Sequence, residues 1–198
     1  MTPIEAALAR AITDLAGHRI ALVGALAVGV RAEPRFTRDA DLAVAVRDDE
    51  DAEQLVLSLQ RSGWRVHALV EHDARERLAT VRLGAPIPEA PRVVVDLLFA
   101  SSGVEAEITA LAEAVEVFPG LVVPVAVRGH LIAMKVLSRD DVRRPQDLVD
   151  LRSLMAAATA EDLEIARQAL ADMARRGYDR GRPLLDDLGV LLASRTRT

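Results

Sequence analysis

Short apolar runs alternate with helix signals through the first half of the chain, the pattern of a sheet covered by helices. The stretch Thr2-Pro3-Ile4-Glu5 is a capping box with proline in the first helical position, and it predicts a helix that runs to about Ala16. Runs rich in β-branched residues predict strands, and segments rich in Ala and Leu predict helices. The predicted strands cover residues 20–23, 41–46, 64–70, 78–83 and 92–99. The helices between them are predicted at residues 25–31 and from 48 or 49 to 62.

The second half of the chain is mainly helical in pattern. A helix over residues 104–113 and extended segments at 115–118 and 121–127 come first. Further helices are predicted at residues 130–138, 146–157, 161–175 and 184–194. Together these elements predict an α/β (α+β) fold, in which helices flank a mixed sheet and a helical C-terminal layer follows. We expect a core over residues 1–128 and a helical region over 129–198 packed on it.

Composition narrows the classes of protein that fit this pattern. The chain has 198 residues, 51% of them hydrophobic and only 3% aromatic, so one core must be packed with aliphatic side chains. It has no cysteine, which excludes disulfides, thiolate catalysis and zinc sites built on sulfur. The net charge of −5 argues against a protein that coats nucleic acid. The longest apolar run, residues 20–30, has about half the length of a membrane helix, so we expect a soluble, cytoplasmic protein without a membrane partner.

Two aspartates, Asp39 and Asp41, stand at the start of the second predicted strand, one strand-length after Gly24. In an extended segment, residues i and i+2 point to the same face with Cα atoms roughly 6.5 Å apart, so both carboxylates can reach one cation. Magnesium takes one or two carboxylates together with substrate phosphates. The pair therefore predicts a magnesium site suited to phosphoryl transfer, although a solvated turn is the alternative for such a short motif.

A third aspartate, Asp96, interrupts the strongly apolar run from Val93 to Phe99. A carboxylate in an interior strand is costly unless it is paired, hydrogen-bonded or bound to metal. Two interpretations remain open: a structural aspartate held by an arginine or by backbone amides, or the third carboxylate of the magnesium site.

Lys135 is the only lysine of the chain, among 25 basic residues. A lysine ammonium is a compact point charge that suits a phosphate oxygen, whereas arginine is a planar fork. We favour contact of Lys135 with a triphosphate. Asp147 and Asp150 follow on a predicted helix, where they either complement the helix N-terminus or orient Lys135 or an arginine. The basic run from Arg139 to Arg144 either steers a triphosphate or RNA toward the site or pairs with nearby acids.

These residues carry a family resemblance. Gly24-Ala25-Leu26-Ala27, followed by Pro34-Arg35-Phe36-Thr37-Arg38-Asp39-Ala40-Asp41, resembles the first motif of the nucleotidyltransferase superfamily. The chain looks closest to the AbiEii-like toxins of type IV toxin–antitoxin systems. The helix with Lys135 and the following stretch Arg143 to Leu151 are similar to the family's lysine helix and its Asp-x-x-Asp segment. The resemblance spans Ile20 to about Leu154 and implies a sheet core like that of DNA polymerase β.

The resemblance also implies roles for individual residues. The catalytic and metal-binding residues would be Asp39, Asp41 and Asp96. The substrate-binding residues would be Gly24, Ala25, Arg35, Thr37, Lys135 and Asp147. One position departs from the family pattern: Gly24-Ala25 stands where Gly-Ser or Gly-Gly is usual. The serine hydroxyl is therefore missing, and alanine would restrict the turn if a positive φ were required there.

The expected function is a magnesium-dependent transfer of a nucleotidyl group from a nucleoside triphosphate to an acceptor on RNA (tRNA) or protein, by the toxin of a type IV pair with a cognate antitoxin. The alternative is a catalytically weak or inactive protein of the same fold that serves as a nucleotide-binding or protein-interaction module. A nucleotidyltransferase that modifies a sugar or an antibiotic is a third reading, and it predicts a pocket lined with extra acids.

Overall fold

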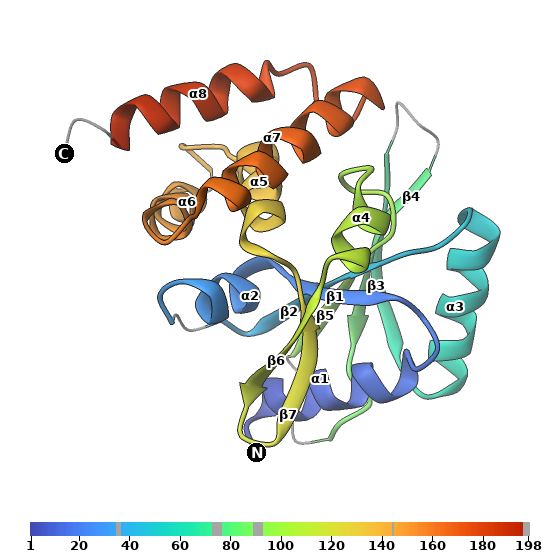
Figure 1. Ribbon diagram of the computed structural model, residues 1–198. Coiled ribbons are helices and arrows are strands. Elements are labelled where there is room, and N and C mark those ends of the chain that lie inside the picture. Colours follow the sequence, from blue (N-terminus) through green and yellow to red (C-terminus); the bar gives the residue numbers. More distant parts are fainter. Residues whose placement is uncertain (35–36, 73–76, 89–92, 144, 196–198) are drawn as a thin grey trace.

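The computed structural model describes residues 1–34, 37–72, 77–88, 93–143 and 145–195. Over these residues, seven strands form one mixed sheet in the order β3-β4-β5-β2-β1-β7-β6 (Figure 1). The strands are β1 (Ile20–Val23), β2 (Asp39–Val44), β3 (Arg65–His72), β4 (Arg77–Gly84), β5 (Val94–Leu98), β6 (Glu113–Phe118) and β7 (Leu121–Val125). This sheet with its flanking helices confirms the predicted α/β (α+β) class.

Eight helices are present in the described part of the chain. The helices are α1 (Pro3–Asp14), α2 (Gly24–Arg31), α3 (Asp49–Arg61), α4 (Glu105–Ala110), α5 (Arg128–Ser138), α6 (Pro145–Ala156), α7 (Ala160–Arg175) and α8 (Leu184–Arg195). In Figure 1, α1 and α3 lie on one side of the sheet, and α5 to α8 gather on the other. None of the described helices is both long and apolar enough to cross a lipid bilayer.

The capping residues of the helices follow the sequence signals. Thr2 and Glu5 form the predicted capping box at the start of α1. Thr159 and Asp162 do the same at the start of α7, and the Asp162 carboxylate also pairs with Arg128 at 2.9 Å. These caps satisfy backbone N–H groups that a helix otherwise leaves without partners.

Strand β2 lies at the centre of the sheet, and its pairing with β1 and β5 positions the aspartates of the cavity described below. It pairs antiparallel with β1 and parallel with β5. Asp41 stands opposite Val23 of β1 on one side and opposite Asp96 of β5 on the other. The two aspartates of neighbouring strands therefore occupy adjacent positions, about 4.8 Å apart along the hydrogen-bonding direction.

Several predicted element boundaries differ from the structure by a few residues, and two of them show the reason. Strand β2 begins at Asp39, because Asp39 and Ala40 already pair with Val94 and Val95 of β5. The helix predicted over residues 104–113 ends at Ala110, since Glu113 pairs with Val125 of β7 and belongs to β6. In both places a ladder of hydrogen bonds with a distant strand outweighs local propensity. Arg92, in the strand predicted at 92–99, lies outside the described residues.

The core is a continuous cluster of aliphatic side chains between the sheet and its helices, as the low aromatic content predicts. Trp64, the only tryptophan, is buried and donates its indole N–H to Asp14 at 2.8 Å. From Arg128 onward the described chain is helical, and α5 packs against α2, α6, α7 and α8. The division at residue 128 into a core and a helical region stays a prediction.

Candidate active site

A cavity of about 600 Å³ opens between the sheet and helices α5 and α6. It brings together residues that the sequence places far apart. The predicted site residues that line it are Gly24, Ala25, Thr37, Asp39, Asp41, Asp96, Lys135 and Asp147. Arg35 lies outside the described residues. The roles of these residues stay predictions, but their convergence on one cavity is a fact of the fold.

Carboxylates form the sheet side of this cavity. Asp39 and Asp41 alternate along β2 with the buried Ala40 between them, so both point to the same face. Asp39 is exposed, Asp41 is half-buried, and Asp96 of β5 is buried. The Thr37 hydroxyl accepts from the Asp39 backbone N–H at 3.3 Å, which ties the preceding loop to the first residue of the strand.

Gly24 joins the end of β1 to the start of α2, directly beside Asp41. Its φ is +64°, the left-handed region that favours glycine. A Cβ atom at this position would lie only 1.9 Å from the Oδ2 atom of Asp41, so a side chain has no room. Ala25 is not among the described residues with positive φ, and the restriction anticipated there does not arise. No side chain of the described residues caps α2, so its first backbone N–H groups point toward the cavity without a capping partner from this part of the chain.

Asp96 is held by an arginine, Arg82, that the sequence did not single out. Arg82 of β4 donates to both oxygens of Asp96, from Nε at 2.9 Å and from Nη2 at 2.7 Å. The pair forms because Arg82 and Asp96 stand opposite each other in the antiparallel β4–β5 ladder. The hydrogen bond and charge of Asp96 raise the pKa of Arg82, and the charges of Asp39 and Asp41 raise it further. The guanidinium therefore lies in the field of all three carboxylates.

The donor set at β2 fits a magnesium ion. Within the described ranges, no three His, Asp or Glu side chains are arranged to ligate one metal ion. Both oxygens of Asp96 are engaged by Arg82, which leaves Asp39 and Asp41 as the carboxylate pair on one face. Two carboxylates completed by phosphate oxygens and water are a normal environment for magnesium. The first of the two interpretations of Asp96, an aspartate held by an arginine, is what this structure shows.

The helical side of the cavity carries the lysine. The ammonium of Lys135 lies 2.7 Å from Asp147 Oδ1 and 2.7 Å from Asp150 Oδ2. The Ser138 hydroxyl donates to the other oxygen of Asp147 at 3.0 Å. All three charged side chains are at most 10% exposed. Asp147 and Asp150 thus orient Lys135. Asp147 also lies in the first turn of α6, so it can complement the helix N-terminus at the same time, and the two interpretations of these acids are compatible.

Two further arginines line the cavity. Arg143 comes from the basic run, whereas Arg139 of the same run pairs with Asp141 at 2.6 Å. The run therefore divides between the cavity and surface pairing. Arg144 lies outside the described residues. Arg180, in the turn between α7 and α8, has a φ of +56° and is the one described non-glycine residue with positive φ. Nothing in the sequence signalled it, because the turn reaches the cavity only through the packing of α7 and α8.

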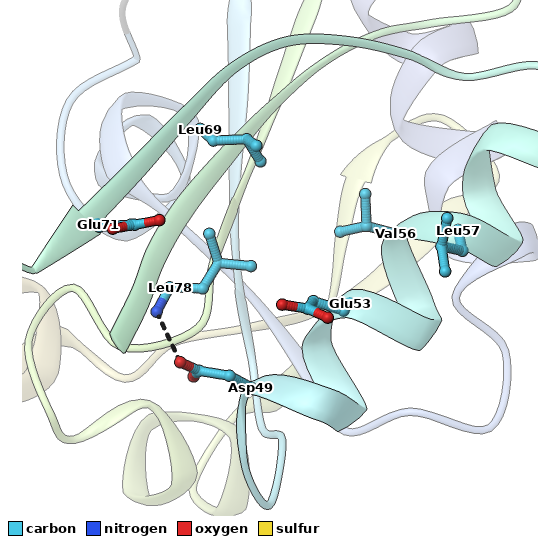
Figure 2. Close-up of a pocket in the computed structure, with 7 residues that line it drawn as sticks. All are labelled: Asp49, Glu53, Val56, Leu57, Leu69, Glu71 and Leu78. Carbon is cyan, nitrogen blue, oxygen red and sulfur yellow. Dashed lines mark hydrogen bonds between the residues drawn. The ribbon is translucent and has the colours of Figure 1, made fainter. Parts of the chain in front are cut away.

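A second cavity, of about 580 Å³, lies between α3 and the β3–β4 hairpin (Figure 2). It is lined by Asp49, Glu53, Val56, Leu57, Leu69, Glu71 and Leu78. Asp49 accepts from the Leu78 backbone N–H at 3.2 Å, the contact drawn in Figure 2. Among the described residues, this lining is apolar and acidic and includes no basic side chain, so it lacks the groups that bind phosphate.

Comparison with known proteins identifies a family for this chain. A family model described as "Nucleotidyl transferase AbiEii toxin, Type IV TA system" matches residues 6–194. No curated protein sequence matches the chain. Among solved structures, the crystal structure of JHP933 from Helicobacter pylori is similar, with 13% sequence identity and a TM-score of 0.45 over 93% of this chain and 85% of that chain.

Proposed function

We propose a function from one premise: this chain belongs to the AbiEii family of nucleotidyl transferase toxins of type IV toxin–antitoxin systems. We infer a magnesium-dependent transfer of a nucleotidyl group from a nucleoside triphosphate to an acceptor hydroxyl on RNA or protein. The observation that carries this inference is one cavity with Asp39 and Asp41 on its sheet side and Lys135 on its helical side. Membership of such a family also implies a cognate antitoxin as partner.

Several residues of the cavity would together bind a triphosphate. Lys135 donates a hydrogen bond to Asp147 and lies 2.7 Å from the carboxylate of Asp150, so its ammonium is held in one position at the cavity wall. The backbone N–H groups at the start of α2 add a second site for phosphate oxygens. Asp39 and Asp41 would hold the magnesium ion, which neutralises phosphate charge when it is bound.

Transfer then needs one bond to form and one to break. The acceptor oxygen attacks the α-phosphorus while the bond from that phosphorus to the bridging oxygen of the β-phosphate breaks, and pyrophosphate leaves. The acceptor proton passes to water or to a carboxylate of the cavity. The protein contributes position and charge: Lys135 and the α2 N-terminus would bind the phosphates that leave, and Asp39 and Asp41 would hold the ion that offsets the charge of the α-phosphate.

The test is incubation of the purified chain with each α-labelled triphosphate, magnesium and total cellular RNA, followed by detection of label in RNA and in protein. We expect label with the native chain and a loss of about 10²–10³-fold in Asp41→Asn, on the scale of removing a group that stabilises the transition state. Glu53→Gln is the matched control, because Glu53 is an exposed acid of the second cavity. Undiminished transfer in Asp41→Asn would overturn the assignment.

A specific observation favours a second candidate function, nucleotide binding without transfer. Asp96 is occupied by Arg82, and Ala25 provides no hydroxyl at the phosphate turn. Under this alternative the chain binds triphosphates with magnesium but labels no acceptor. Bound triphosphate together with an absence of label in every acceptor fraction is the outcome that favours it.

A further inference from the structure

We propose that Arg82 is a positioning residue that occupies Asp96 in the free protein and releases it when a triphosphate takes over the guanidinium, a role that rests on the function proposed above. The consequence is ordered assembly: the third carboxylate joins the metal site only with substrate present. Arg82 has no counterpart in the motifs that carry the family resemblance.

The geometry of the pair makes Arg82 the movable partner. Both guanidinium contacts are short and parallel, at 2.9 and 2.7 Å, so the fork covers both carboxylate oxygens at once. The Arg82 side chain is 50% exposed, whereas the Asp96 side chain is 11% exposed and lies in a central strand. The carboxylate is therefore fixed by the sheet, and the guanidinium is held by the carboxylate at the edge of solvent.

Arg82 also supplies charge where a metal ion would. Asp39, Asp41 and Asp96 lie along two paired strands, and Arg82 lines the same cavity. A positive guanidinium beside this group lowers the repulsion among the three carboxylates. It also lowers the attraction of the group for a cation in the free protein.

A triphosphate is a better partner for the guanidinium than Asp96 is. The guanidinium side of the pair is half-exposed, so water screens part of its attraction to Asp96 and Arg82 can turn to another anion without leaving solvent. Phosphate groups accept the same two parallel N–H donors and carry more negative charge. When the fork of Arg82 turns to a phosphate, the two oxygens of Asp96 become available on the metal side of the cavity.

Metal binding without nucleotide tests this role. The full-length chain is titrated with manganese(II) as the probe, and free manganese is followed by electron paramagnetic resonance. We expect Arg82→Gln to bind manganese about tenfold more tightly than the native chain and to bind a triphosphate more weakly, because the two ligands use Arg82 in opposite ways. A merely structural arginine would shift both affinities in the same direction or neither.

The double variant Arg82→Gln with Asp96→Asn identifies the ligand that is released. We expect it to lose the gain in manganese affinity, because the gain requires the Asp96 carboxylate. Arg77→Gln is the matched control: Arg77 lies on the same strand but pairs with Asp49 at 2.6 Å, and its removal should leave manganese affinity within about twofold. Arg82→Lys keeps the positive charge but lacks the planar guanidinium. We expect its manganese affinity to lie between those of the native chain and Arg82→Gln, and this variant keeps the test usable if Arg82→Gln folds poorly.

Unchanged or weaker manganese binding in Arg82→Gln would overturn the role of Arg82, as would a gain that persists in the double variant. The measurement uses no acceptor and no transfer assay. Failure of the native chain to label any acceptor would therefore count against the proposed activity and leave the manganese result standing.

Discussion

The two sides of the cavity each hold a cation against carboxylates, but at different depths. On the helical side, the Lys135 side chain is 10% exposed, and its partners Asp147 and Asp150 are 4% and 2% exposed. On the sheet side, the Arg82 side chain is 50% exposed against Asp96 at 11%. The two ion pairs therefore have similar contact distances but differ in exposure: the cation is buried on the helical side and half-exposed on the sheet side.

Burial decides which ion pair holds the structure and which can be exchanged. Removing one partner of a buried pair leaves an uncompensated charge away from water, which costs about 3–5 kcal/mol. A fully exposed pair contributes about 0–1 kcal/mol, and the pair of Arg82 and Asp96 lies between the two cases because only its guanidinium is exposed. The helical side is therefore set before any ligand arrives, whereas the sheet side carries a half-exposed cation that can exchange partners.

The largest expected effect comes from breaking the helical side. Lys135→Met should lower the free energy of unfolding by about 3–5 kcal/mol, because Asp147 and Asp150 lose their cation while buried. Arg82→Gln should lower it by less, about 1–3 kcal/mol, because it leaves one buried carboxylate, Asp96, without its cation, whereas the guanidinium that it removes is half-exposed. Urea unfolding of both variants at one pH measures the contrast. Equal losses in the two variants would remove the distinction between the two sides.

A fall in pH should destabilise the helical side of the molecule through His130, which is buried on α5. Burial lowers the pKa of His130 from its usual value of 6.5 to about 4, and the charge of Glu107 offsets a little of this effect. The unfolded chain therefore takes up a proton on this histidine at a higher pH than the folded chain does. Stability from this group is present above pH 6.5 and is lost as the pH falls from 6.5 toward 4.

Between pH 7 and pH 5 this difference should cost about 2 kcal/mol of unfolding free energy. Urea unfolding at the two pH values measures it, and His130→Asn should show a smaller loss because asparagine does not titrate. An equal pH dependence in the two proteins would show that His130 is not the group responsible.

A smaller effect is expected at the glycine beside Asp41. Gly24→Ala should lower the free energy of unfolding by about 1–2 kcal/mol through the positive φ, and it should also weaken manganese binding because the new Cβ displaces the Asp41 carboxylate. Gly120→Ala is the matched control: its φ is +79°, and no atom lies within 4 Å of the added Cβ. Both variants should lose stability by thermal unfolding, but only Gly24→Ala should lose metal affinity.

The sequence was informative where chemistry follows from local spacing. Asp39 and Asp41 share a face because any extended segment places residues i and i+2 together, and β2 has that geometry. Lys135 stood out because it is the only lysine among 25 basic residues. The fold class followed from alternating apolar runs and helix signals, and it is confirmed.

The misses share one cause, contact with a distant segment. Arg82 meets Asp96 only because β4 pairs with β5 in one register, and the sequence shows the polarity of the residue but not its partner. Glu113 belongs to β6 because it pairs with Val125 of β7. Arg180 reaches the cavity from a turn more than 130 positions beyond Asp41, which no local pattern encodes.

By itself the sequence determined the types of element, the candidate carboxylates and the lysine, since these depend on propensity, period and residue chemistry. The depth of each charge, and the charge that it faces, follow from how distant segments pack together. The reason is physical: strand register and helix packing set the distance between ionic groups and their exposure to water, and these two quantities determine whether an ion pair supports the fold or yields to a ligand.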